Sequence, residues 1–421
     1  MLKRSNNSPA VQKKNYTLAF FVALSSLGFY NPMNIISPQM QKLLFYAICS
    51  FVFCYTYING ISLKRKQFPK LEYAVLLSSI LFSIFIVYLY QDQSLFISIQ
   101  ATLPFIFAYA FLFILLKMNL PLQRVESMLI VFGMIEILVN GINHLTFPNN
   151  FFGGSVEEID TSRGIARVRG GIICTCFLFF YSLSQIKNSR KALWRVLALL
   201  SYFFIILSVT RQYIAYTTLF GGLFLLSRTS WQKKILFGTI MLVLIRISME
   251  IPMIKAMIEL SADQKDDNEV NEDIRLVAYA MYLFEFQRNE ITQIFGNGVP
   301  SLGNSAWGIE FENMTDILHT YAADIGWGGF YFHFGLLGTI ALFVIFIKAI
   351  CKRYQEQYKY ISYLLVVFLL TNFTSGSIFY RYEIIFLMFY FYIAFSAPST
   401  NGCLVTLKEK TGNRIINKTL K

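Results

Sequence analysis

The sequence has few charged residues, and this scarcity argues against a soluble globular protein. Charged side chains make up 14% of the 421 residues, whereas ordinary soluble domains contain about 25%. Hydrophobic residues make up 55%, and the mean hydropathy is +0.51. A soluble core could not bury this much apolar surface, so the surrounding solvent must be lipid. The composition therefore predicts an all-α membrane protein that crosses the bilayer many times.

Several motifs of nucleotide-dependent and hydrolytic enzymes are also missing. The sequence contains no D-x-D pair that could hold a metal-bound nucleotide sugar, no Walker A motif and no G-x-S-x-G nucleophile elbow. Its six cysteines form no zinc-binding pattern. Most of them lie within apolar runs, where cysteine behaves as a small buried hydrophobe. We therefore predict neither a cofactor nor a metal site.

Apolar runs of membrane-crossing length are abundant. A helix needs roughly 20 apolar residues to cross the hydrocarbon core, and by that rule the chain has about twelve candidate spans. They cover residues 16–36, 43–61, 71–90, 95–116, 127–145, 170–186, 192–210, 212–226, 235–249, 326–347, 360–375 and 378–397. The eighth and ninth are short and the last two are almost continuous, so the count is uncertain by about one or two spans.

The net charge of +13 is distributed as in an oriented membrane protein. With a cytoplasmic N-terminus, most lysines and arginines flank the inner ends of the predicted spans, and most acids fall in outer segments. This bias matches the positive-inside rule. It predicts that both termini are cytoplasmic, that residues 398–421 form a basic cytoplasmic tail, and that the protein binds no nucleic acid.

Two of the predicted outer segments, 147–169 and 250–325, are too long to be simple connectors. Loops of this length are usually functional or disordered. The second contains an amphipathic stretch at 274–286, which could lie along the membrane interface, and a glycine-rich turn at 296–304. We therefore predict a single integral membrane domain over 1–421, with the larger external loop ordered into short helices between the ninth and tenth spans.

Arg211 lies in V-T-R-Q-Y-I-A-Y, at the outer edge between the seventh and eighth predicted spans. An ionisable residue at membrane depth is energetically unfavourable and by default indicates a site. Small residues follow it on one helical face (Ala215, Thr218 and Gly222), which permits close helix packing. The alternative is an arginine that extends to lipid headgroups. An outer position runs against the charge bias and weakens this alternative.

The outer loops carry further arginines. Arg275 opens the amphipathic stretch in N-E-D-I-R-L-V-A-Y. A cation is unfavourable at a helix N-terminus, so an anionic partner is expected there, either a ligand or the preceding acids. Arg163, Arg167 and Arg169 lie in the first loop. They could bind phosphate through paired hydrogen bonds or anchor the loop to anionic lipid headgroups.

His319 lies in D-I-L-H-T-Y-A-A-D-I-G-W-G-G, just before the tenth predicted span. Imidazole is the natural general base near neutral pH, and Asp316 or Asp324 could orient the ring. The alternative is an interfacial histidine bonded to the backbone. Tyr321 is one of several nearby aromatics that could stack on sugar faces, although a membrane interface belt explains them equally well.

Together these segments resemble the O-antigen polymerase and O-antigen ligase superfamily. The resemblance rests on T-R-Q-Y-I-A-Y, E-D-I-R-L-V-A-Y, G-N-G and H-T-Y-A-A-D-I-G-W-G-G, within residues 192–347. The sequence departs from the family pattern at Thr320, where Asn or Ser is common, and at Asp324, where Glu is common. The resemblance implies a GT-C-like fold in a bacterial cytoplasmic membrane, with the active site on the external face.

The resemblance also implies a chemistry. Such enzymes transfer a glycan from an undecaprenyl-pyrophosphate carrier to an acceptor, without metal or nucleotide. Arg211 and Arg275 would hold the donor pyrophosphate and stabilise the leaving group, and His319 would take the acceptor proton. The expected partners are the carrier-linked glycan and membrane lipid, with a chain-length regulator and a flippase as further candidates. The expected substrate-binding residues are Arg163, Arg167, Arg169, Tyr321 and Asp324.

Several functions stay open at this point. A polymerase joins carrier-linked repeat units, whereas a ligase transfers finished polymer to another acceptor; two arginine-bearing outer loops resemble the polymerases more. A transporter, such as a lipid-linked oligosaccharide flippase, would need paired charges deep in its spans. Glu136 and Arg246 are the candidates, although Glu250 could neutralise Arg246, and the absence of a visible internal repeat weakens this reading. A non-catalytic assembly scaffold is a third possibility.

Overall fold

A computed structural model describes most of the chain, and its described part is helical. The described residues are 9–27, 35–59, 68–146, 151–152, 171–189, 191–208, 210–227, 229–232, 235, 238–239, 274–287, 289–318 and 320–400. Across these ranges there is no strand, and Tyr354 and Ser399 form an isolated antiparallel bridge. The predicted all-α class is confirmed.

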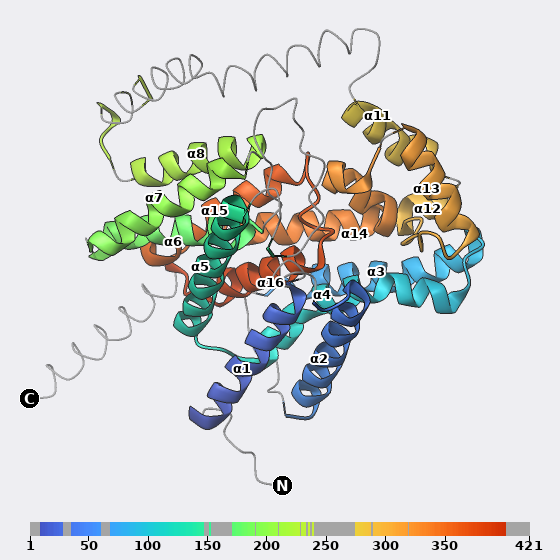
Figure 1. The fold of residues 1–421 in the computed structure, drawn as a ribbon, viewed down its shortest axis with the longest axis horizontal. Coiled ribbons are helices and arrows are strands. Elements are labelled where there is room, and N and C mark those ends of the chain that lie inside the picture. The colour runs from blue at the N-terminus through green and yellow to red at the C-terminus, as the bar shows by residue number, and fades with distance from the viewer. Residues whose placement is uncertain are drawn as a thin grey trace, which may run out of the picture.

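The longer helices pack side by side into a bundle, and short helices form a lobe beside it (Figure 1). The bundle helices are α1 (Pro9–Ser26), α2 (Pro38–Asn59), α3 (Lys70–Tyr90), α4 (Leu95–Met118), α5 (Leu122–Thr146), α6 (Ile173–Ser189), α7 (Ala192–Leu207), α8 (Arg211–Leu226), α14 (Gly326–Ile350), α15 (Tyr360–Thr371) and α16 (Arg381–Ser396). The helical lobe, residues 274–325, contains α11 (Ile274–Ala280), the π-helix η3 (Met281–Glu285), α12 (Glu290–Phe295), α13 (Ala306–Leu318) and the 3-10 helix η4 (Ala322–Ile325). A further 3-10 turn, η5 (Glu356–Tyr358), precedes α15.

Among the residues that the structure describes, five helices are long and apolar enough to cross a membrane: α2 from Gln39, α3, α4, α5 and α14. The predicted count of about twelve spans is not confirmed. Most other predicted spans coincide with shorter helices, and the predicted span at 235–249 lies largely outside the described residues. Side-chain contacts explain why α15 ends at Thr371, before the end of its predicted span at 375. Asn372 donates to Phe368 O (2.6 Å) and accepts from Ile378 N (3.1 Å), which turns the chain away after α15.

Contacts between helix ends identify one end of the bundle as basic. The start of α3 meets the end of α14 through the Glu72–Lys348 ion pair. Lys352, just after α14, donates to Ala394 O (2.8 Å) and Ala397 O (2.6 Å) at the end of α16. Here cations meet helix C-termini, where the dipole favours them. We call this the basic end.

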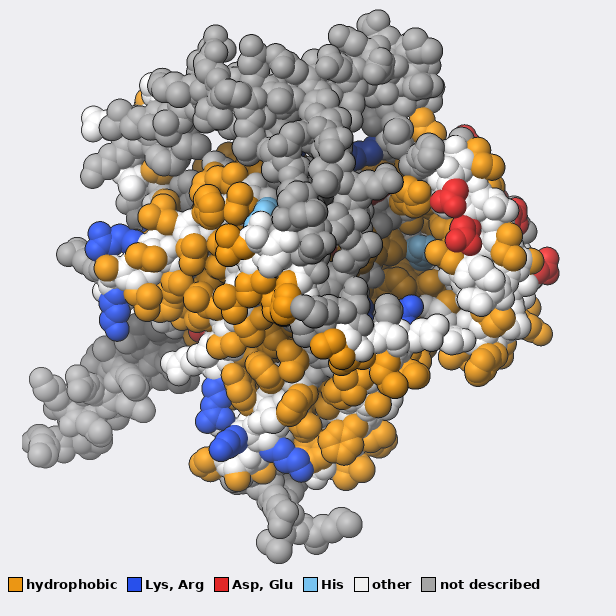
Figure 2. Space-filling model, in the orientation of Figure 1, with side chains coloured by type: hydrophobic (Ala, Val, Ile, Leu, Met, Phe, Trp, Pro, Cys, Tyr) orange, Lys and Arg blue, Asp and Glu red, His pale blue; other side chains and the backbone are white. Residues whose placement is uncertain are grey.

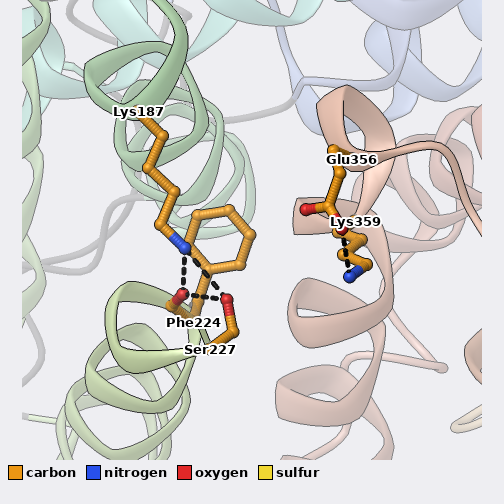
Figure 3. A network of polar contacts seen from close by, with 5 residues as sticks. All are labelled: Lys187, Phe224, Ser227, Glu356 and Lys359. Carbon is orange, nitrogen blue, oxygen red and sulfur yellow. Dashed lines mark hydrogen bonds and ion pairs between the residues drawn. The ribbon is translucent and has the colours of Figure 1, made fainter. Parts of the chain in front are cut away.

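Lys187 ties two further helices at the basic end (Figure 3). Its ammonium group donates to the carbonyl of Phe224 and to Ser227 Oγ (3.0 Å), at the last turn of α8. The same group lies 4.1 Å from the centroid of the Phe224 ring. A lysine of α6 therefore caps the C-terminus of α8. Glu356 and Lys359 form a nearby ion pair.

The helical lobe gives the opposite end an acidic surface. Acidic side chains gather over α12 and α13 in Figure 2, whereas basic side chains gather at the left and bottom of that view. The acids are exposed or half-buried: Glu285, Glu290, Glu310, Glu312 and Asp316. Figure 2 also shows a hollow between the lobe and the bundle, in which a basic side chain and a histidine side chain are visible. We call this the acidic end.

A kink in α14 anchors the lobe to the bundle. Gly335 has φ 71° and ψ −178°, which interrupts the regular hydrogen bonding of the helix. The carbonyls of Phe332 and His333 instead accept from the backbone N–H groups of Asn297 (2.7 Å) and Gly298 (3.0 Å). Inside a membrane protein, irregular backbone is tolerated where other protein groups satisfy its hydrogen bonds.

The turn between α3 and α4 also binds this part of the lobe, the loop that follows α12 (residues 296–305). Gln91 donates to Asn297 Oδ1 (2.8 Å). Gln93, only 1% exposed, accepts from Ser301 N (2.9 Å) and Ser305 Oγ (2.7 Å) and donates to Val299 O (3.1 Å). Two glutamines thus connect the N-terminal part of the bundle to the lobe.

Replacing Gln93 with leucine is expected to lower the free energy of unfolding by about 2–4 kcal/mol, because buried backbone groups of the loop lose their partners. The measurement is thermal unfolding of the purified protein in detergent. Gln293→Leu is the matched control, since Gln293 is exposed on α12 and the structure gives its side chain no hydrogen bond. Equal melting temperatures for the two variants would show that Gln93 does not hold the loop.

Candidate functional site

The segment between α15 and α16, residues 372–380, is where the elements that carry the predicted site residues meet. The start of α14 reaches it through a hydrogen bond from Trp327 N to Asn372 O (2.9 Å). Because α14 and α15 both run between this segment and the basic end, the segment lies at the acidic end. We call it the connecting segment.

Arg211 is the first residue of α8, at the helix start that the sequence predicted, and it is exposed. Two residues later, the hydroxyl of Tyr213 hydrogen-bonds Ser377 in the connecting segment. Tyr213 is only 4% exposed, and its ring lies 5.9 Å from that of Phe368 on α15. Packing of Tyr213 therefore fixes the end of α8 from which Arg211 extends.

Arg275 lies in the first turn of α11, as predicted, and is also exposed. On the same helix, Tyr279 donates to Phe373 O of the connecting segment (2.7 Å). The helices of Arg211 and Arg275, far apart in the sequence, therefore contact the same short segment. No single motif could have predicted this juxtaposition.

The π-helix η3 links α11 to the neighbourhood of the predicted base. Tyr282 donates to the carbonyl of Thr320 (3.2 Å), the residue after His319. Burial raises the pKa of the Tyr282 hydroxyl above its ordinary value, so the group remains a donor at physiological pH. Thr320 is itself buried, and its N–H donates to Thr315 O (3.0 Å). The position next to His319 is thus held by both η3 and α13.

The other predicted site residues divide into two groups. His319, Arg163, Arg167 and Arg169 lie outside the described residues. Tyr321 and Asp324 are described and exposed. The hydroxyl of Tyr321 donates to Asp316 Oδ1 (3.4 Å), so one of the two acids proposed to orient the histidine has a tyrosine partner. Asp324 lies in η4, which leads into α14.

His333 is a candidate that the sequence reasoning did not select, because it lies within an apolar span. Its Nδ1 is 2.8 Å from Gly298 O. A carbonyl can only accept, so Nδ1 carries the proton and Nε2 of the neutral ring keeps its lone pair. The ring lies 5.4 Å from Phe379 of the connecting segment and 5.2 Å from Phe332. An oriented imidazole therefore faces aromatic rings at the acidic end.

The first turn of α16 carries two more charged groups that sequence reasoning missed, in Y-R-Y-E. The only sequence signal was a charged pair between two apolar runs. The guanidinium of Arg381 lies 4.6 Å from the centroid of the Phe45 ring on α2. Glu383 is 8% exposed and its Oε1 accepts from the hydroxyl of Tyr382 (2.7 Å).

Glu136, which the sequence analysis considered as a deep charge, is fully buried in the middle of α5. Its Oε2 accepts from Thr175 N (2.7 Å) and Thr175 Oγ1 (2.9 Å), at the first turn of α6, where the helix dipole favours an anion. Its Oε1 and the Oε2 of Glu383 are buried without a hydrogen-bond partner in the described part of the chain. Two buried carboxyl groups are thus only half satisfied.

Three arginines thus lie at the starts of helices that lead to or contact the connecting segment. Arg211, Arg275 and Arg381 supply guanidinium groups, which bind phosphate and carboxylate oxygens in paired geometry. Among the described residues, no cluster of three or more His, Cys, Asp or Glu side chains could hold a metal ion. Comparison with protein-family models finds no match to the chain, and comparison with curated proteins finds no significant relative.

Proposed function

We propose that the protein is a membrane glycosyltransferase that polymerises undecaprenyl-pyrophosphate-linked oligosaccharide repeat units into O-antigen, capsule or exopolysaccharide. One observation supports it above the others. The helices of Arg211 and Arg275 contact the same connecting segment, through Tyr213 and Tyr279. Two arginines whose helices are bonded to the same segment fit a pyrophosphate better than two unrelated surface arginines would.

In this proposal the two arginines and a histidine divide the reaction between them. The acceptor hydroxyl gives its proton to His319 and its oxygen attacks the anomeric carbon of the donor sugar. The bond from that carbon to the phosphate oxygen breaks, and the carrier pyrophosphate leaves with the bonding electrons. Arg211 and Arg275 stabilise the negative charge that develops on it. Arg163, Arg167, Arg169, Tyr321 and Asp324 would bind the remaining substrate.

The proposed orientation places the basic end in the cytoplasm of a bacterium and the acidic end outside its cytoplasmic membrane. The separation of charges between the two ends supports it, because lysine and arginine concentrate on cytoplasmic sides. The proposed topology has about twelve spans in a GT-C-like arrangement, with both termini cytoplasmic. The lobe and the connecting segment then face the compartment where carrier-linked glycans are assembled.

Two other functions differ in what they require of these residues. A ligase would use the same arginines and histidine but transfer finished polymer to another acceptor. A lipid-linked oligosaccharide transporter is favoured by a separate observation, the half-satisfied buried carboxyl groups of Glu136 and Glu383. Such groups inside a membrane often belong to ion-coupled transport. For a transporter, Glu136 and Glu383 would matter and His319 would not.

The proposed function is tested by polysaccharide length in a host that carries the cognate glycan cluster and lacks the native gene. Wild type, His319→Ala and the double variant Glu136→Gln/Glu383→Gln are compared at matched expression. We expect a ladder of chain lengths from wild type and from the carboxamide variant. We expect only single repeat units on the acceptor with His319→Ala.

The remaining outcomes identify the alternatives. Long polymer that accumulates on the carrier in the histidine variant, without reaching its final acceptor, indicates a ligase. A full ladder from His319→Ala, together with no surface glycan from the carboxamide variant, contradicts the transferase and supports a transporter. Unchanged glycan in both variants also removes the transferase proposal and leaves a scaffold.

A further inference from the structure

His333 is held in one orientation by a glycine of the lobe. The backbone N–H of Gly298 donates to the carbonyl of His333 (3.0 Å), and the imidazole Nδ1 lies 2.8 Å from the carbonyl oxygen of Gly298. Gly298 has φ 71°, and a Cβ there would lie 1.7 Å from Val87 Cγ2 and 2.7 Å from the Ser83 carbonyl oxygen. The glycine that binds the histidine therefore tolerates no side chain, and the imidazole ring is fixed from two sides.

The second ring nitrogen of His333 keeps its lone pair. A carbonyl oxygen accepts a hydrogen bond only from a protonated Nδ1, so Nε2 of the neutral ring is an acceptor. Within the described part of the chain, the polar contact of the ring is the one to Gly298, and Nε2 receives no hydrogen bond. A ligand group that binds this nitrogen must therefore carry a proton, as a hydroxyl does. A deprotonated phosphate or carboxylate offers only acceptors.

Phenylalanine rings surround the imidazole. The distance between ring centroids is 5.2 Å to Phe332 and 6.0 Å to Phe334 on α14, 6.3 Å to Phe311 on α13 and 5.4 Å to Phe379 in the connecting segment. Phe311, Phe332 and Phe334 are buried, whereas Phe379 is only half-buried. An accessible aromatic ring thus lies beside an oriented imidazole.

These two side chains border the hollow between the lobe and the bundle. Figure 2 shows a histidine side chain in that hollow, and His333 is the described histidine that contacts the lobe, through Gly298 and Phe311. Phe379 belongs to the segment to which the helices of Arg211 and Arg275 are bonded. The pair formed by His333 and Phe379 therefore adjoins the segment that supports the proposed pyrophosphate site.

A sugar matches this combination of groups better than other ligands do. One face of a sugar ring carries C–H groups that pack against an aromatic ring, and its edge carries hydroxyls that each donate one hydrogen bond. A lipid tail could pack on Phe379 but has no donor for Nε2 of His333. Aromatic side chains with a few fixed polar groups are the usual lining of a site that orients a small ligand.

We propose that Phe379 and His333 form a sugar subsite, in which the phenylalanine ring packs against a sugar of the carrier-linked glycan and Nε2 accepts a hydrogen bond from one of its hydroxyls. The subsite rests on the proposed function, since it assigns to the same end of the bundle a part of the substrate that the arginines do not bind. A sugar that lacks this hydroxyl leaves Nε2 without a donor, so the pair selects among sugars. In this assignment His333 binds the sugar and takes no proton from it.

The test compares the binding of two probes by the purified full-length protein in a neutral detergent. One probe is the carrier-linked repeat unit of the cognate cluster, and the other is undecaprenyl phosphate, which carries no sugar. The readout is the shift in melting temperature as each probe is titrated. We expect His333→Asn to raise the apparent Kd of the repeat unit about tenfold and to leave that of undecaprenyl phosphate unchanged. The asparagine amide can still donate to the Gly298 carbonyl, so the unliganded variant should melt near the wild-type temperature.

Three further variants separate a binding role from a structural one. His333→Gln keeps a polar group near the position of Nε2 but loses the bond to Gly298, so it should bind the repeat unit better than His333→Asn and melt at a lower temperature. A purely structural histidine would give the reverse order of affinities. Phe379→Leu keeps an apolar side chain without a flat ring and should weaken binding of the repeat unit alone. Phe51→Leu, at an exposed position on α2, should bind both probes as the wild type does.

Unchanged affinity for the repeat unit in either His333→Asn or Phe379→Leu would overturn the subsite, and so would an equal loss of affinity for both probes. If His333→Asn does not fold, Phe379→Leu decides alone. The proposed function fails by a different result, a full ladder of chain lengths from His319→Ala, and the binding comparison still decides the subsite in that case. Normal binding by the variants, together with loss of the ladder in His319→Ala, contradicts the subsite alone.

Discussion

Replacing Arg211 with alanine is expected to lower the rate of chain growth by about 100- to 1000-fold, the usual effect of removing one preorganised donor from a site where charge develops. Arg211 is exposed at the start of α8, so its removal leaves no cavity in the bundle. The burial of Tyr213 and its hydrogen bond to Ser377 remain to hold the helix end. The variant should therefore insert and melt as the wild type does.

The measurement is the rate of polymer formation from a purified carrier-linked repeat unit, with the melting temperature recorded alongside. Arg211→Lys should recover part of the rate, because an ammonium keeps the charge without the paired hydrogen bonds. Arg195→Ala removes the same side chain from the basic end and should leave the rate unchanged. Full activity of Arg211→Ala would remove this arginine from the proposed donor site.

Replacing Gly335 with alanine is expected to lower the free energy of unfolding by about 3 kcal/mol or more. With φ 71° and ψ −178°, Gly335 occupies a backbone region that is essentially reserved for glycine. A Cβ there would lie 2.3 Å from Ile294 O and 2.4 Å from Gly296 N. The clashing atoms belong to the backbone, so no side-chain movement can relieve the contact.

Gly303→Ala is the matched control for this prediction. Gly303 also has positive φ, 67°, but a Cβ at this position meets no atom within 4 Å. Its substitution should therefore show only the strain of a left-handed residue, roughly 1–2 kcal/mol. Thermal unfolding of both variants in detergent separates the cost of backbone strain from the cost of the steric clash made by the added Cβ. Similar losses for the two glycines would show that the lobe does not depend on the close approach at the kink.

The parts of the fold that depend on local sequence could be predicted. Apolar runs predicted helices near their observed positions, because hydropathy and helix length are properties of one segment. The amphipathic stretch at 274–286 is helical in the structure, as α11 and η3. Arg275 lies in the first turn of a helix, as predicted, and Arg211, which was predicted between two spans, is the first residue of α8.

The parts that depend on distant contacts could not be predicted. Gln93 and its partner Val299 are 206 residues apart, and neither belongs to a recognisable motif. Gly335 lies in an apolar run that hydropathy reads as one continuous helix. The short stretch between the last two predicted spans gave no sign of the connecting segment, because the role of this segment comes from its contacts with α8, α11 and α14.

The connecting segment also has a consequence for the depth at which chemistry would occur. The 12 residues of α15 extend about 18 Å along a helix axis, compared with roughly 30 Å for the hydrocarbon core of a bilayer. A helix that starts at the cytoplasmic surface would therefore end well below the outer headgroups. In the proposed orientation the connecting segment would then lie below the level of the outer headgroups. A lipid phosphate would have to move toward the centre of the bilayer to reach the arginines, whereas the growing sugar chain would remain in the external solution.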